Sequence, residues 1–332
     1  MRSQPAALAS LGEFAFLERL LPGLRPQSPD VLLGVGDDCA VVRASGRLVL
    51  TIDAFLEGVH FEAAWMTPRQ IGAKAFAINA SDIAAMGGTP RWALVALAAP
   101  ATYSVKALFE VERGIVAAAR AAGCDVIGGN LSRADRLGVT IAMIGETSRP
   151  LTRAGAQPGD AIYITGTLGD SALALRMLQR GLPRRQAVLR RFLRPQARLQ
   201  TGQLLSAQGL ASAAIDVSDG LVQDLGHLCR ASRVGAEIAA DALPLSSAYR
   251  AICGDDLALA LHGGEDYELL FTVPPAQAVR LRRRATKLGC PVTAIGTVVA
   301  RRGVRVDGAT VAEGGHDHFR RTKQRLGRER QR

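Results

Sequence analysis

The stretch Ala-Ala-Ile-Asp-Val-Ser-Asp-Gly, residues 213–220, places a short strand directly before a helix. Its first residues favour an extended chain to Val217, and the apolar periodicity that follows predicts a helix from about Asp219 to Ala231. Asp216 follows the apolar residues Ala213, Ala214 and Ile215, so its carboxylate would be costly to bury without a cation. A strand that ends in aspartates at the start of a helix therefore suggests a cation-binding loop.

Strands and helices also alternate through the rest of the chain. One helix has clear signals at both ends. Thr67 is its N-cap, Pro68 is its first residue, and the pair Gly87-Gly88 ends it. Strands are predicted at Val31–Val35, Arg47–Asp53, Trp92–Ala99, Asp125–Ile127, Gly138–Glu146, Ala161–Thr165, Ala214–Val217 and Tyr267–Val273. Helices are predicted at Pro68–Met86, Ser104–Ala122, after Gly169, near Ala197–Gln208 and near Gln277–Leu288.

A cluster of prolines and glycines between Ser148 and Asp160 marks a domain boundary. We expect an α+β (mixed α/β) fold with two domains, residues 1–148 and 149–319, followed by a basic tail at residues 320–332. With 332 residues, of which 48% are hydrophobic, each domain can bury its own core.

The composition also bears on location. The longest apolar stretches, such as Trp92–Ala99, are shorter than the roughly 18 residues that span a bilayer. Glu13 and Glu18 interrupt the mildly apolar N-terminal run, which a secretory leader would not tolerate. The five cysteines are scattered and form no CxxC pair. We therefore expect a cytoplasmic protein with no membrane contact.

The net charge of +11 raises the question of nucleic acid. Residues 320–332 contain seven Lys or Arg against one Glu, a balance of +6, which leaves +5 for the rest of the chain. A short terminal charge run is usually solvated, so we do not expect the chain to bind nucleic acid. The rival hypothesis is a non-catalytic RNA-binding protein, which predicts salt-sensitive RNA affinity that is lost when this tail is deleted.

The familiar nucleotide-binding and catalytic motifs are absent. The chain has no GxxxxGK[ST] loop, and Gly34-Val35-Gly36 is followed by aspartates instead of completing a dinucleotide fingerprint. It also lacks HExxH, GxSxG and the protein-kinase signatures. Any chemistry must use another arrangement.

Aspartates recur at the ends of strands and helices. Thr51 and Asp53 lie on one face of their predicted strand because side chains alternate. Asp82 comes late in its helix, where the macrodipole disfavours an anion unless a cation is near. Each position alone has a structural alternative: Asp219 as an N-cap, Asp37 in an Asx turn, or Asp82 facing solvent. Together they suggest a site for a hard cation such as Mg²⁺.

Taken in order, these segments resemble the thiamine-monophosphate kinase family, within the ATP-binding superfamily of aminoimidazole ribonucleotide synthetase. The resemblance covers about residues 12 to 319. The matching runs are Gly12–Phe14, Gly34–Cys39, Thr51–Asp53, Glu57–Phe61, Lys74–Gly87, Gly128–Asn130, Leu151–Gly155, Tyr163–Thr167, Gly169-Asp170, Ile215–Gly220 and Gly263–Glu268.

The resemblance implies ATP-dependent phosphorylation of thiamine monophosphate by a homodimer whose N-terminal domains pair. Roles by position are implied in the same way. Magnesium would be held by Asp37, Asp38, Thr51, Ile52 through its backbone, Asp53, Asp82, Asn130, Asp216 and Asp219. ATP would contact Gly128, Gly129, Arg153 and Ser218. Thiamine monophosphate would contact His60, Glu265 and His316. No general base is expected.

Two positions depart from the family pattern. Asn130 stands where the family usually has Asp, and His316 stands where it tends to have Tyr or Trp. Other enzymes of the superfamily, such as selenophosphate synthetase or aminoimidazole ribonucleotide synthetase, remain the nearest alternative. The surroundings of His60 and Glu265 favour the thiamine enzyme over them.

Overall fold

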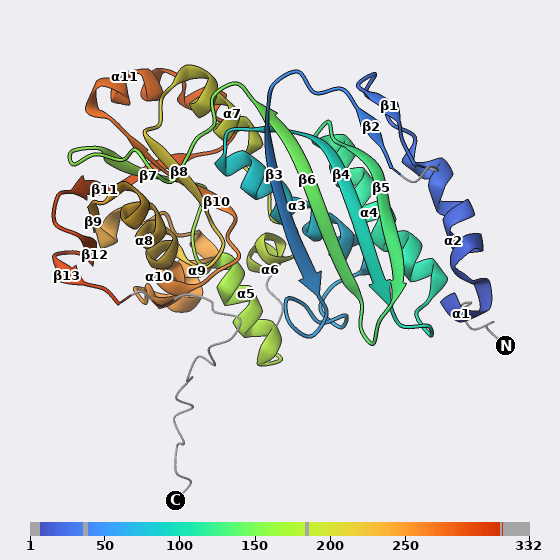
Figure 1. The fold of residues 1–332 in the computed structure, drawn as a ribbon. Coiled ribbons are helices and arrows are strands. Elements are labelled where there is room, and N and C mark those ends of the chain that lie inside the picture. The colour runs from blue at the N-terminus through green and yellow to red at the C-terminus, as the bar shows by residue number, and fades with distance from the viewer. Residues whose placement is uncertain (1–6, 36–38, 183–185, 313, 315–332) are drawn as a thin grey trace, which may run out of the picture.

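A computed structural model describes residues 7–35, 39–182, 186–312 and 314. Two large β-sheets lie next to each other, one from each half of the chain, and helices pack against both (Figure 1). A third, two-stranded sheet lies near the N-terminus. Buried apolar side chains form a cluster that runs from the first half into the second. Among the described residues, none of the helices is both long enough and apolar enough to cross a membrane.

The first half of the chain builds a four-stranded sheet in the order β3-β6-β4-β5. β3 and β4 are antiparallel to β6, and β5 is parallel to β4. The elements are α1 (Leu8–Leu11), α2 (Glu13–Leu20), a 3₁₀ turn (Leu21–Leu24), β1 (Val31–Leu33), β2 (Val41–Val42), β3 (Arg47–Leu56), α3 (Pro68–Ala85), β4 (Thr89–Ala99), α4 (Val105–Ala121), β5 (Asp125–Arg133) and β6 (Gly138–Thr147).

Helices α3 and α4 cover one face of this sheet (Figure 1). The two helices approach closely because each has a glycine at the contact. A Cβ on Gly72 would meet the carbonyl oxygen of Val111 at 1.9 Å, and one on Gly114 would meet that of Arg69 at 2.1 Å. The predicted start of α3 is confirmed, since Thr67 and Gln70 form a capping box. The opposite face of the sheet leaves apolar side chains of β3 exposed.

The second half builds a seven-stranded sheet in the order β13-β12-β9-β11-β7-β10-β8. Its elements are β7 (Ala161–Thr165), α5 (Asp170–Gln179), α6 (Gln186–Leu193), α7 (Leu199–Gln208), β8 (Ala213–Val217), α8 (Leu221–Ser232), β9 (Gly235–Ile238), a 3₁₀ turn (Ala240–Ala242), α9 (Ser247–Cys253), α10 (Ala258–His262), β10 (Glu268–Val273), α11 (Pro275–Arg283), a 3₁₀ turn (Ala285–Lys287), β11 (Val292–Val299), β12 (Gly303–Val306) and β13 (Ala309–Thr310). All but one of its strand pairings are antiparallel.

Helix α3 joins the two halves, because it packs against α7 and β8 as well as its own sheet. The edge strand β8 therefore lies beside the C-terminal end of α3. This contact brings Asp216 of β8 next to Ser81 of α3, whose hydroxyl donates to the Asp216 carboxylate at 2.7 Å. The site is built across this junction.

The mixed fold class is confirmed, but several boundaries differ from the predictions. The strand predicted at Asp125–Ile127 continues to Arg133 through two glycines. Gly129 fits there because a Cβ would lie 2.0 Å from the Val95 carbonyl oxygen of the neighbouring strand. α8 begins at Leu221, two residues later than expected. β9, β11 and β12 were not predicted: β9 and β12 are only four residues long, and β11 contains an internal glycine.

Candidate active site

A cleft of about 440 Å³ lies between the two halves of the chain, where β3 and α3 face β8 and the loop before β10. This volume is typical of small-molecule sites. Seven of the residues singled out from the sequence line it: Asp53, His60, Asp82, Asp216, Ser218, Asp219 and Glu265. Segments that are far apart in the sequence therefore meet in one place.

Three carboxyl groups from three different elements meet in the cleft. Asp53 comes from β3, Asp82 from the last turn of α3 and Asp216 from β8. The Asp53 and Asp82 side chains share a hydrogen bond. The Thr51 hydroxyl donates to Asp82 Oδ2 at 2.5 Å, so the predicted alignment of Thr51 with Asp53 brings two oxygens to the same point.

Burial and mutual repulsion disfavour the ionised forms of these carboxyl groups. Burial, and then the charge of Asp82, raises the pKa of Asp53 to about 6. Burial also raises the pKa of Asp82. Burial and the charge of Asp82 raise the pKa of Asp216 to about 7. The charge of Arg153 acts in the opposite direction on Asp82 and Asp216 without cancelling these effects.

This set of oxygens fits a hard divalent cation. Carboxylate and hydroxyl oxygens are the ligands that Mg²⁺ prefers, and Mg²⁺ is commonly held by one or two carboxylates together with substrate phosphates. Asp216 is 5% exposed, so water can do little to stabilise its charge. A cation in the cleft would relieve both the burial cost and the repulsion.

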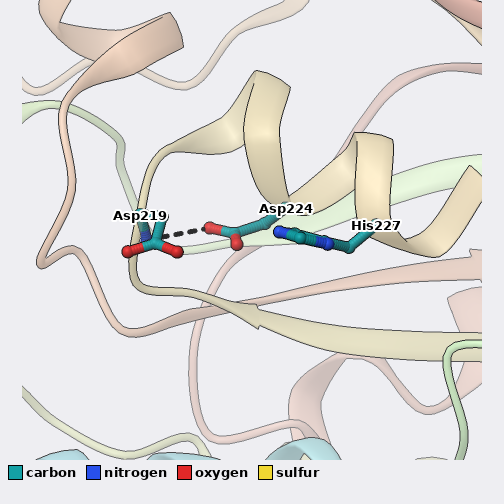
Figure 2. A group of neighbouring side chains, drawn as sticks. All are labelled: Asp219, Asp224 and His227. Atoms are coloured by element: carbon teal, nitrogen blue, oxygen red, sulfur yellow. Dashed lines mark hydrogen bonds between the residues drawn. The ribbon is translucent and has the colours of Figure 1, made fainter. Parts of the chain in front are cut away.

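The loop after β8 is held by a carboxylate from within the next helix (Figure 2). Asp224 Oδ2 accepts hydrogen bonds from the backbone N–H groups of Ser218, Asp219 and Gly220 at 3.1, 3.0 and 3.1 Å. The alternative role of Asp219 as an N-cap is wrong, because Gly220 occupies that position. The Asp219 side chain instead lines the cleft and accepts from Gln223 at 3.0 Å.

His227 lies further along the same helix, next to Asp224 (Figure 2). One ligand atom from each of Asp219, Asp224 and His227 lies within 4.8 Å of the other two. Because three backbone amides already engage Asp224, we assign it to holding the loop and not to a second metal site. Burial, and then the charge of Asp219, raises the pKa of Asp224 to about 7 against the effect of those amides.

Of the residues expected to contact substrates, His60 and Glu265 line the same cleft, whereas Arg153 is not part of its lining. His60 lines it while its Nδ1 accepts from the Leu56 backbone N–H at 3.0 Å. Glu265 has a left-handed backbone (φ 69°), and its N–H donates to the Ser218 carbonyl at 2.7 Å. Arg153 is exposed, and its charge acts on two of the cleft's carboxyl groups.

The structure does not bring every predicted residue together. Gly128, Gly129 and Asn130 lie on β5, at the opposite edge of the sheet from β3. Three strand spacings, about 14 Å, separate these two strands. The three residues border another hollow, of about 80 Å³, lined by apolar side chains of α2, α4 and β4. The Ile52 side chain is 65% exposed on the sheet surface, which leaves its backbone as the possible ligand.

Asp37, Asp38 and His316 lie outside the described residues. Four contributors to the site were not singled out from the sequence, because each acts through a hydrogen bond or ion pair that only folding creates: Asn79, Ser81, Lys74 and Asp224. Of these four, only Asp224 could have been found from the sequence. It is an acidic residue in the first turn of a helix, where the helix dipole favours a negative charge.

Comparisons with known proteins match both halves of the chain. Residues 36–147 match the family model described as AIR synthase related protein, N-terminal domain, and residues 157–308 match its C-terminal domain. A curated thiamine-monophosphate kinase from Aquifex aeolicus (strain VF5) is 37% identical over 321 residues, which cover 94% of this chain and 99% of that protein.

Solved structures agree with these matches. The crystal structure of thiamine-monophosphate kinase from Stenotrophomonas maltophilia K279a has a TM-score of 0.83 and 39% identity, and the match covers 90% of this chain and 98% of that one. A structure described as "AaThiL complexed with AMPPCP and TMP" has a TM-score of 0.76 and 36% identity, with 96% of this chain and all of that one covered.

Proposed function

This chain belongs to the thiamine-monophosphate kinase family, and from that membership we propose that it transfers the γ-phosphate of ATP to thiamine monophosphate. The product is thiamine diphosphate. The observation that carries this proposal is the gathering of Asp53, Asp82, Asp216 and Asp219 around one cleft together with His60 and Glu265. The relative described with AMPPCP and TMP supports both substrates.

The proposed reaction needs positioning and charge compensation more than proton transfer. The acceptor is a phosphate monoester whose second pKa near 6 leaves it mostly dianionic at pH 7, so no general base is required. The obstacle is repulsion between two polyanions that must meet in line. Magnesium, when bound, would supply positive charge that offsets this repulsion. The aspartates of β3, α3 and the β8 loop would hold it, with Asp37 and Asp38 proposed beside them.

The remaining residues would orient the two substrates. Ser218 lies in the loop that Asp224 holds, and we propose that it contacts the ATP phosphates together with Arg153. His60 and Glu265 would contact the thiamine moiety, with His316 proposed as a third contact. The test is to incubate the pure protein with ATP, Mg²⁺ and thiamine monophosphate and to look for thiamine diphosphate. Absence of product from correctly folded protein would refute the proposal.

Asn130 offers a test of the metal site. Asn keeps an oxygen ligand but lacks the charge of the usual aspartate, so we expect this protein to need more magnesium than a relative with Asp. Asn130→Asp should lower the magnesium concentration for half-maximal activity several-fold, and Asn130→Ala should raise it. A magnesium titration at saturating ATP measures this. An unchanged titration in both variants would show that the position is not a ligand.

We also propose that the protein is a homodimer in which the exposed faces of the four-stranded sheets pair. Five large apolar side chains on β3 and β4 are between 39% and 71% exposed on this face: Leu48, Leu50, Ile52, Leu56 and Leu94. Such a contiguous apolar face is typical of an interface. Pairing that sets the edge strand β5 of one copy beside β3 of the other would bring Asn130, Gly128 and Gly129 to the partner's cleft.

Mixed dimers test this arrangement. We expect Asp219→Ala and Asn130→Lys each to inactivate the homodimer, the second because a lysine would repel the metal. If Asn130 acts in the partner's cleft, a dimer with one copy of each variant keeps one intact site and regains roughly half the wild-type activity per dimer. Activity of the purified heterodimer is the measurement. No recovery would place Asn130 in the cleft of its own chain.

We propose domain boundaries at 148/149 and 319/320. The first boundary is supported by the segment without strands or helices between β6, which ends at Thr147, and β7, which begins at Ala161. We place the protein in the cytoplasm on the sequence features given above.

A further inference from the structure

Lys74 is a fully buried lysine in the wall behind the cleft. Its side chain is 0% exposed, and its Nζ lies 3.0 Å from Glu265 Oε2. The same Nζ lies 3.6 Å from the centroid of the Phe192 ring and 5.6 Å from that of Phe55. Burial lowers the pKa of Lys74, and the charge of Glu265 opposes that shift. The ammonium group is therefore held by one carboxylate and two aromatic rings.

This ion pair joins the two halves of the chain. Lys74 belongs to α3, and Glu265 belongs to the loop between α10 and β10. The loop is also tied to the β8 loop, because the Glu265 N–H donates to the Ser218 carbonyl at 2.7 Å and the Tyr267 N–H donates to the Val217 carbonyl at 2.8 Å. A left-handed backbone at Glu265 requires such support, since L-residues seldom adopt it.

The pair presents one face of the Glu265 carboxylate to the cleft. The Glu265 side chain is 21% exposed and lines the cleft, whereas Lys74 lies behind it and is not part of the lining. Lys74 engages Oε2. One carboxylate oxygen is therefore fixed by the ammonium group, and the orientation of the other is set by the same contact.

Helix α3 also fixes the position of Lys74, and through it of Glu265, relative to the carboxyl group of Asp82. Lys74, Ile78 and Asp82 are spaced four residues apart, so they follow one face of α3. Eight residues of helix place Lys74 about 12 Å along the axis from Asp82. A single rigid helix thus sets the distance between the group that holds Glu265 and a proposed magnesium ligand.

We propose that Lys74 is a positioning residue that orients Glu265 toward the acceptor and thereby sets the affinity for it. This inference rests on the proposed function, in which Glu265 contacts thiamine monophosphate. The acceptor carries a cationic ring and an amino group at a distance from its phosphate, and a fixed carboxylate recognises both. Without Lys74, the Glu265 carboxylate would lose its ion pair and face a cleft that four aspartates line.

The test combines kinetics with a double-mutant cycle. Lys74→Met keeps the length and apolar packing of the side chain and removes the charge. We expect it to raise the KM for thiamine monophosphate about tenfold or more, because a charge-assisted hydrogen bond is lost. The KM for ATP and the magnesium requirement should stay within about twofold. Lys106→Met, an exposed lysine on α4, is the matched control and should change none of these values.

Glu265→Gln completes the cycle. If Lys74 acts through Glu265, the double variant Lys74→Met/Glu265→Gln should have the same KM for thiamine monophosphate as Glu265→Gln alone. If the two substitutions instead multiply their effects on the KM for thiamine monophosphate, the inference is wrong. It is also wrong if Lys74→Met raises the KM for ATP as much as the KM for thiamine monophosphate. Lys74→Gln, which can still donate to the carboxylate, should give an intermediate value and serves as the second variant if Lys74→Met does not fold.

Calorimetric binding of thiamine monophosphate separates this inference from the proposed function. If the wild-type protein binds the compound but forms no thiamine diphosphate, the proposed function fails. The affinities of the wild type, Lys74→Met, Glu265→Gln and the double variant for thiamine monophosphate still decide the role of Lys74. If the wild type binds and Lys74→Met binds equally well, the inference fails while the kinase proposal stands. No binding by the wild type would overturn both.

Discussion

Asp219→Ala and Asp53→Ala are each expected to lower kcat by roughly a thousandfold or more, which corresponds to about 4 kcal/mol of transition-state stabilisation. Both carboxylates line the cleft from opposite halves of the chain. Neither is replaceable by a neighbour, because the proposed metal must be held at a fixed point while two polyanions meet. The same loss is expected for Asp38→Ala on the basis of the sequence.

These variants should fold normally. Asp219 lies in a loop whose backbone is held by Asp224, and removing the Asp53 carboxyl relieves repulsion with Asp82. Steady-state turnover at saturating ATP and magnesium, with thermal melting as the folding check, is the measurement. Asp255→Ala, an exposed aspartate outside the cleft, is the control and should be fully active. Near-normal activity in two of the three site variants would refute the metal-site assignment.

Asp216→Asn is expected to separate stability from function. Burial raises the pKa of the Asp216 carboxyl from 3.8 to about 7. A carboxyl whose pKa is higher in the folded state than in the unfolded state destabilises the fold at a pH above both values, here by roughly 4 kcal/mol at most. At pH 8 without metal, the asparagine variant should therefore melt several degrees higher than the wild type. Its amide can still accept the hydrogen bond from Ser81.

Magnesium should stabilise the wild type much more than the asparagine variant. In the wild type, saturating Mg²⁺ is expected to raise Tm by roughly 5 °C, because a ligand at 100 times its Kd adds about 2.7 kcal/mol. The shift should be much smaller in Asp216→Asn, which should also be inactive. Melting curves of both proteins with EDTA and with Mg²⁺ measure it, and Na⁺ at equal ionic strength controls for screening. An equal magnesium shift in both proteins would exclude Asp216 as a ligand.

The prediction of the main helices succeeded where local signals agreed. The capping residues of α3 gave its start correctly, and the two glycines that follow it gave its end. The strands β9, β11 and β12 were missed because their stability comes from pairing with distant strands and not from local pattern. The strand that begins at Asp125 was predicted to end too early for the same reason. Gly129 weakens an isolated strand, but in the sheet a glycine is required at this position beside Val95.

The sequence by itself determined the family of this chain and pointed to a set of aspartates as proposed metal ligands, because the order and spacing of the motifs are properties of the chain alone. Only the tertiary structure decided which of them meet. It placed Asp53, Asp82 and Asp216 together, left Asn130 on the far edge of the sheet, and showed that Asp224 and Lys74 hold the loops that bring Asp219 and Glu265 to the cleft. The physical reason is that hydrogen bonds and ion pairs between segments up to 191 residues apart form only once α3 has packed against both sheets.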